Sequence, residues 1–161
     1  AWATDPTYHN DIRVTLYGHN KLSELETTAD VQLNVNFGDG LTLRRSIVNA
    51  AVVGPGELVQ VSTIWQVDKQ QPDYKFSMRL LREDGSAIAA WDYVPQNWIS
   101  PTSLWIVGSQ AVDQRGILLP ATVEPGQYQI TLRLYDPSNG IPVDTEMGQD
   151  IVLGEIEITS S

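Results

Sequence analysis

The sequence predicts an all-β domain, an antiparallel β-sandwich of immunoglobulin-like or jelly-roll type with about eight strands. The first observation is that apolar and polar residues alternate along most of the chain, which is the pattern of strands buried on one face. The second is that turns rich in Gly, Pro, Asp and Asn separate the alternating segments. The third is that no segment shows the apolar period of an amphipathic helix, so strand-helix-strand units are not expected.

The predicted strands cover residues 31–37, 41–53, 58–67, 74–80, 87–94, 110–119, 128–134 and 151–158. Within the second strand the alternation changes phase at Arg44 and Arg45, as a β-bulge would cause. Trp65 lies on the apolar side of its strand, which places it in the expected core. Gly85, in the sequence Glu-Asp-Gly-Ser, tolerates a positive φ, so a hairpin turn is expected there.

The chain of 161 residues has the length of one domain. Residues 29–161 form the predicted sandwich, and residues 1–28 form a lead-in segment that offers one further edge strand. The longest apolar runs, such as residues 50–53, are far too short for a membrane span, and no signal peptide is recognisable. No transmembrane segment is therefore expected in this chain.

Composition excludes several classes of function. The chain has 10 Lys and Arg against 20 Asp and Glu, a net charge of -10, whereas a nucleic-acid partner requires a basic surface. Because the sequence contains no cysteine, a disulfide, a thiolate nucleophile and cysteine-ligated zinc are also excluded. His9 and His19 lie in the lead-in with Asp11, where solvated surface is favoured over a zinc site or a hydrolase triad.

Five segments between residues 56 and 143 carry a resemblance to a known family. They are the strand GPGELVQVSTIW, the hairpin DYKFSMRLLREDG, and the segments WDYVP, PTSLW and GQYQITLRLYDPSNGIPV. In their order and spacing they resemble the extracytoplasmic β-sandwich that follows the multi-span membrane part of bacterial glycosyltransferases of the dolichyl-phosphate-mannose type, and related surface proteins. The chain has Val107-Gly108 where that family has Pro-Gly after the PTSLW segment, a departure that affects a turn.

The resemblance implies a non-catalytic accessory domain of a larger cell-envelope protein, located outside the cytoplasm. It implies no catalytic residue and no cofactor in this chain, because the transferase chemistry belongs to the membrane part. The expected partners are a polysaccharide or the membrane part of the parent chain. One alternative is a carbohydrate-binding module with exposed aromatic residues, and a second, less favoured, is a glycoside hydrolase.

The aromatic residues near 91–98 are the candidate ligand site. Sugar rings stack their C–H faces on exposed Trp and Tyr side chains. If the aliphatic side of strand 87–94 is the core side, Trp91 and Tyr93 point outward, and Trp98 and Asn97 extend the shelf.

The opposite assignment of the same strand is favoured. In it, Trp91 fills the sandwich, Asp92 is the exposed residue, and Trp98 and Trp105 cover the open end of the core. The two assignments predict opposite exposures for Trp91 and Tyr93, so a structure can separate them.

The acidic residues suggest two further sites. A glycosidase needs two facing carboxylates, and Asp92 with Asp113 or Asp136 is the candidate pair. Turn chemistry is favoured instead: Asp92 would accept backbone N–H bonds from the loop that follows it, and Asp136 would cap its own turn by an Asx bond. Asp136, Asn139 and Asp144 are candidate Ca²⁺ ligands, but no Asp-x-Asp-x-Asp-Gly loop occurs, so no metal is expected.

Overall fold

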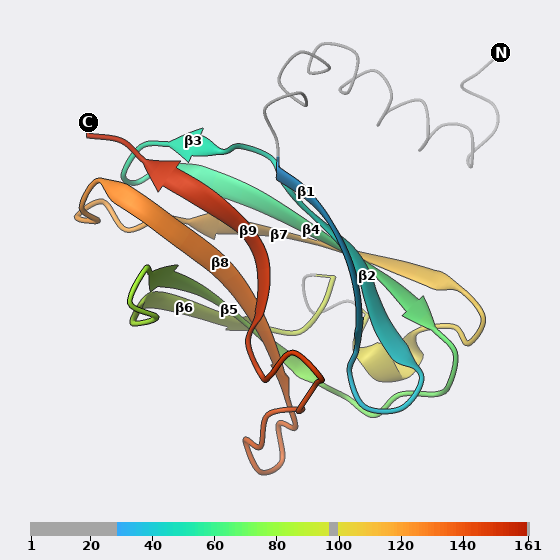
Figure 1. Ribbon diagram of the computed structural model, residues 1–161. Helices are drawn as coiled ribbons and strands as arrows, with labels where there is room; N and C mark the ends of the chain where they lie inside the picture. Colours follow the sequence, from blue (N-terminus) through green and yellow to red (C-terminus); the bar gives the residue numbers. More distant parts are fainter. Residues whose placement is uncertain (1–28, 97–99, 161) are drawn as a thin grey trace, which may run out of the picture.

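The computed structural model describes residues 29–96 and 100–160, and it shows two β-sheets packed face to face (Figure 1). The four-stranded sheet has the order β1 (Ala29–Asn36), β2 (Leu41–Val48), β4 (Leu58–Val67), β7 (Gln110–Leu118). The five-stranded sheet has the order β3 (Val52–Val53), β9 (Ile151–Ile158), β8 (Gly126–Tyr135), β5 (Lys75–Arg82), β6 (Ala87–Tyr93). The predicted all-β sandwich is confirmed, with nine strands in the described part of the chain.

All neighbouring strands pair antiparallel except β3 and β9, which are parallel. A single turn of 3-10 helix, η2 (Thr102–Leu104), precedes β7. Among the described residues, no helix has the length and apolar composition needed to cross a membrane. The lead-in 1–28, with His9, Asp11 and His19, lies outside the described residues.

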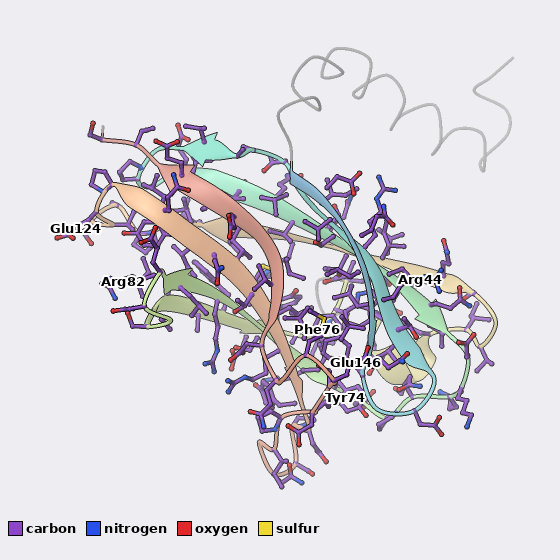
Figure 2. All side chains as sticks on the ribbon, viewed as in Figure 1. Arg44, Tyr74, Phe76, Arg82, Glu124 and Glu146 are labelled. Atoms are coloured by element: carbon purple, nitrogen blue, oxygen red, sulfur yellow. The ribbon has the colours of Figure 1, made fainter. Side chains whose placement is uncertain are left out.

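The core lies between the sheets and is built from the alternating apolar side chains of both (Figure 2). Trp65 is fully buried, as its position in the alternation predicts. Its ring centroid lies 5.2 Å from that of Phe37, 5.4 Å from Phe76 and 6.0 Å from Trp105, so it touches aromatic rings from three other segments. Because Phe76 belongs to β5, this cluster joins the two sheets.

The predicted strand over 41–53 is wrong in one respect, because it is two strands in different sheets. β2 ends at Val48, and β3 joins the five-stranded sheet beside β9. The backbone N–H of Glu157 bonds the carbonyl of Ala51 at 2.8 Å, which fixes the crossing. Alternation reports which face is buried and not which sheet a strand joins, so this crossing has no signal in the pattern.

Two finer predictions are confirmed. The β2–β4 register shifts between Leu43 and Arg45, which is the expected bulge. The β5–β6 hairpin closes through a bond from the Arg82 N–H to the Ser86 carbonyl at 2.9 Å, with Gly85 at φ +84°.

Candidate functional site

Strand β6 presents its aromatic residues to the core and its small or charged residues to solvent. Tyr93 is fully buried, and its ring centroid lies 5.7 Å from that of Phe76. Trp91 is partly buried and packs against the core, whereas Ala90 and Asp92 are exposed. An exposed shelf that includes Tyr93 is therefore wrong, because burying the aromatic side of β6 removes more apolar area from water than burying the other side.

The remaining members of the predicted aromatic site have different outcomes. Asn97 and Trp98 lie outside the described residues. Trp105 is buried over Trp65, and its indole N–H bonds the carbonyl of Ser100 at 3.1 Å. This confirms the expected covering of the core by Trp105.

A polar groove, here called the Arg79 groove, lies on the outer face of β5, β6 and β8. It has a volume of about 270 Å³ and is lined by Ser77, Arg79, Asp92, Arg133, Tyr135, Gly140 and Pro142. Its centre is one row of directly opposed residues, in which Ser77 on β5 pairs with Asp92 on β6 and with Arg133 on β8. Since adjacent strands are about 4.8 Å apart, the backbones that carry Asp92 and Arg133 are separated by about 10 Å.

Hydrogen bonds hold the two ends of this row in place. The Tyr135 hydroxyl donates to Asp92 Oδ2 at 3.0 Å. Arg133 forms a bidentate pair with Asp150, with Nε–Oδ1 at 2.9 Å and Nη2–Oδ2 at 2.6 Å. Desolvation and this bond to the Asp92 carboxylate raise the pKa of Tyr135.

Arg79 stands one step further along β5, opposite Thr131 of β8 and Ala90 of β6. Its Nε lies 3.5 Å from Ser77 Oγ, which is a weak contact. In the part of the chain that the structure describes, no carboxylate lies within salt-bridge distance of Arg79. Its guanidinium therefore retains donors that a ligand can use.

One wall of the groove comes from the segment between β8 and β9. The chain folds back along β8, with the Asp136 N–H bonded to the Ile141 carbonyl at 3.0 Å and the Val143 N–H bonded to the Leu134 carbonyl at 2.8 Å. This return places Gly140 and Pro142 beside Tyr135. The loop converts an open strand face into a groove.

Turn bonds engage the calcium candidates of this segment. Asp136 Oδ1 accepts the Ser138 hydroxyl at 2.6 Å and the Ser138 N–H at 2.8 Å, the second being the predicted Asx bond. The hydroxyl bond and then the N–H bond lower the pKa of Asp136. Asn139 Oδ1 accepts the Ile141 N–H at 2.8 Å, and Asp144 Oδ1 accepts from Gln149 at 2.8 Å. Among the described residues, no three His, Asp or Glu side chains converge as metal ligands.

Asp113, one of the candidate partners of Asp92, belongs to a different environment. It is buried between the sheets, where its Oδ1 accepts the Gln96 N–H at 2.6 Å. The predicted loop bond is thus made by Asp113, whereas Asp92 accepts from Tyr135. Burial raises the pKa of Asp113 and raises that of the neighbouring Tyr93 well above its ordinary value.

Arg115 makes a cation–π contact in this buried cluster, because its guanidinium carbon lies 4.8 Å from the Tyr93 ring centroid. The Tyr93 hydroxyl faces Asp113 without a hydrogen bond of normal geometry among the described residues. The cluster closes the sandwich between the edge strands β6 and β7, and Asp113 does not line the Arg79 groove.

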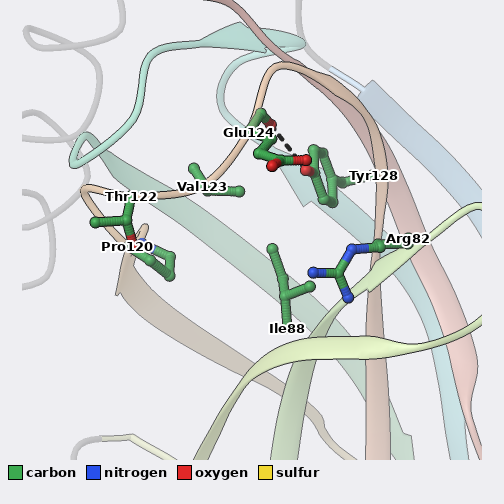
Figure 3. Close-up of a pocket in the computed structure, with 7 residues that line it drawn as sticks. All are labelled: Arg82, Ile88, Pro120, Thr122, Val123, Glu124 and Tyr128. Atoms are coloured by element: carbon green, nitrogen blue, oxygen red, sulfur yellow. Dashed lines mark hydrogen bonds between the residues drawn. The ribbon is translucent and has the colours of Figure 1, made fainter.

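A second pocket of about 270 Å³ lies at the end of the sandwich near the β5–β6 turn (Figure 3). Arg82 and Ile88 come from the hairpin, and the other lining residues come from the segment that leads into β8 and from Tyr128. The Tyr128 hydroxyl donates to the Glu124 carbonyl at 2.7 Å. Most of its lining belongs to turns, whereas the polar side chains of the Arg79 groove stand on three paired strands, which hold a site more rigidly.

Comparisons with known proteins support the fold. No protein-family model matches the chain, and no curated protein matches it in sequence. Among solved structures, the C-terminal domain of Wzt aligns with a TM-score of 0.54 at 10% identity, covering 83% of this chain and 79% of that one. A Niemann-Pick type C2 protein from Japanese carpenter ant aligns with a TM-score of 0.45 at 7% identity, covering 81% and 96%. At 10% identity the likeness to the Wzt domain concerns the fold alone.

The site predicted from the sequence lay on aromatic residues and missed the groove, although the polar residues at outward strand positions were a signal for it. Outward positions of β5 carry Lys75, Ser77 and Arg79, and those at the end of β8 carry Arg133 and Tyr135. What the sequence does not contain is the register that aligns Ser77 with Asp92 and Arg133.

Proposed function

We propose that this chain is a non-catalytic accessory domain of a larger cell-envelope protein, and that it binds a saccharide chain in the Arg79 groove. The observation that carries the proposal is the row Asp92–Ser77–Arg133, with Arg79 and Tyr135 beside it, on paired strands. The location outside the cytoplasm, and attachment to a membrane glycosyltransferase, rest on the family resemblance of the sequence.

The chemistry of the groove supports a polyhydroxylated ligand. Each sugar hydroxyl both donates and accepts a hydrogen bond, and the groove offers acceptors on Asp92 and donors on Arg79. Its volume of about 270 Å³ is just below the usual range for drug-sized ligands, which suits one sugar unit at a time. Tyr135 adds a ring against which C–H groups can pack.

The position of the carboxylates supports binding rather than hydrolysis. Glycoside hydrolysis uses two carboxyl groups that flank the scissile bond. Of the residues that line the groove, Asp92 is the carboxylate. Of its two candidate partners, Asp113 is directed between the sheets, and Asp136 is bonded to Ser138 in its own turn. Asp92 is also bonded to Tyr135, which suits an acceptor in a fixed position.

A glycan array followed by calorimetry on the best ligand tests this proposal. Asp92→Asn should weaken binding about 10-fold, because it removes a charged acceptor worth about 1.5 kcal/mol or more. Asp68→Asn is the matched control, since Asp68 is an exposed carboxylate that does not line the groove. Full binding by Asp92→Asn, or an array with no ligand, would contradict saccharide recognition here.

The same ligand also tests the non-catalytic part. Product analysis after prolonged incubation should show an unchanged saccharide. Cleavage that is lost in Asp92→Asn and kept in Asp68→Asn would show that the groove is an active site.

A further inference from the structure

We infer that the Arg79 groove selects saccharides that carry a negatively charged substituent, a carboxylate or a phosphate, and that Arg79 holds this group. This inference rests on the proposed function and names the ligand class of the same groove. It follows from how the charges of the groove are already paired.

Most charges around the groove are accounted for within the protein. The Asp150 carboxylate accepts from Nε and Nη2 of Arg133 and so neutralises its charge, and the Tyr135 hydroxyl is bonded to Asp92. Arg79 differs, because its side chain makes a long contact to Ser77 Oγ at 3.5 Å, and no carboxylate of the described residues forms a salt bridge with it. A planar guanidinium with free donors is suited to bidentate contact with a carboxylate or a phosphate.

The arginines that line the groove are unusual for so acidic a chain. The protein has a net charge of -10, yet the groove lining contains two arginines and one aspartate. Because Asp150 pairs with Arg133, the arginine charge of the groove that has no carboxylate partner among the described residues is that of Arg79, and it lets an anionic ligand approach one place while the acidic surface elsewhere repels it. A neutral glycan can accept hydrogen bonds from Arg79 but gains no charge attraction from it.

The register also places the anion within the groove. Arg79 lies opposite Thr131, so Arg133 is its diagonal neighbour two residues further along β8, at about 7–8 Å. Asp92 is the diagonal neighbour of Arg79 on the other flank, two residues along from Ala90. Since Asp92 repels an anion and accepts hydroxyl donors, the charged substituent is directed to the side of Arg79 and Arg133, with sugar hydroxyls toward Asp92.

Calorimetry with the 161-residue chain tests the inference. The probes are trigalacturonate, its neutral methyl ester, and inorganic phosphate alone. We expect trigalacturonate to bind at least about 10-fold more tightly than the ester, a charge-assisted hydrogen bond being worth about 1.5 kcal/mol or more. Arg79→Gln should reduce this ratio to about one, whereas Arg44→Gln, at an exposed arginine of β2 on the other sheet, should leave it unchanged.

The outcomes separate the inference from the proposed function. Equal binding of trigalacturonate and its ester, sensitive to Asp92→Asn, would overturn the charge inference and leave saccharide binding intact. Binding of phosphate as tight as that of trigalacturonate would show an anion site with no saccharide recognition. A glycan array whose ligands are all neutral would also overturn the inference, and a melting curve of Arg79→Gln would show that this variant is folded.

Discussion

The two outer faces of the sandwich differ although the same strand alternation produces both. The four-stranded sheet presents mainly uncharged amides and hydroxyls, contributed by Gln32, Asn34, Asn36, Thr42, Gln60, Ser62, Gln66, Gln110 and Gln114. Its ion pair, Arg45 with Asp30, is largely exposed and contributes little to stability. The five-stranded sheet presents charged side chains on β5, β6 and β8, and the segment between β8 and β9 folds beside them.

The difference shows which strand positions of a sandwich can determine ligand specificity. Inward positions are mostly apolar because the sheets pack through them, and the polar residues among them, such as Thr63 and Asp113, accept hydrogen bonds within the protein. Outward positions are free, and on the five-stranded sheet they hold a row of opposed polar residues with a loop at its side. Fold and site are thus encoded in alternate residues of the same strands.

The largest expected effect concerns the core that both faces share. Trp65→Ala should lower the free energy of unfolding by about 3–5 kcal/mol, because it empties a fully buried aromatic site. Thermal denaturation should show a melting temperature lower by about 10 °C. A melting temperature within about 2 °C of the parent would mean that the buried face of β4 is assigned wrongly.

A smaller effect separates an inner hydroxyl from an outer one. Thr63 accepts the Trp65 indole N–H at 2.8 Å, so Thr63→Val leaves a buried donor without a partner and should cost about 1–3 kcal/mol. Thr131 is equally buried on the outward side of β8, but its hydroxyl has no partner among the described residues. Thr131→Val should change stability by less than about 0.5 kcal/mol in chemical denaturation. Equal costs would contradict this distinction.

A pair of turn glycines distinguishes the groove from an ordinary turn. Gly140 has φ +72° and Gly85 has φ +84°, and a Cβ at either would meet nothing within 4 Å. Alanine at each position should cost about 1–2 kcal/mol through backbone strain alone. Gly140 lines the groove and Gly85 does not, so only Gly140→Ala should weaken saccharide binding. Weaker binding in Gly85→Ala as well would argue that the groove is not the site.

The smallest effect is expected at Asp113, because asparagine keeps an acceptor for the Gln96 N–H. The pKa of Asp113 is raised in the folded protein by burial, so the folded state holds its proton at a pH where the unfolded chain has released it. This contribution to stability is present below the ordinary Asp pKa and is lost as the pH rises through the raised value.

Melting curves of the parent and Asp113→Asn between about pH 3 and pH 8 test this linkage. The variant should gain stability relative to the parent as the pH rises. Carboxylates with lowered pKa, such as Asp30, act in the opposite direction but are common to both proteins, so they cancel in the difference. A difference that shrinks with rising pH would contradict the expected sign.

The sequence predicted the fold better than the site, for a physical reason. Burial of one strand face imposes alternation, which is local and therefore visible, as at Trp65. The error at 41–53 arose because the change of sheet between Val48 and Val52 leaves alternation intact. The sequence left two assignments of β6 open because both of its sides carry apolar residues, and packing decides for the favoured one, with Tyr93 buried and Asp92 exposed.

The groove depends on long-range relations that local patterns do not record. Asp92 and Arg133 are distant in sequence and become neighbours of Ser77 through strand pairing. The bond between Tyr135 and Asp92 joins residues 43 positions apart. Each residue was visible as an outward polar position, but the set exists only once the strand order is known.

Mapping of the bound saccharide by amide chemical shifts tests the central claim most directly. The isotope-labelled chain would be titrated with trigalacturonate while its ¹H–¹⁵N correlation spectrum is recorded. The account predicts shifts concentrated on β5, β6, β8 and the segment that carries Gly140, with the exposed amide-rich face of β1, β2, β4 and β7 unchanged. Shifts centred on the four-stranded sheet, or a spectrum that does not change, would contradict it.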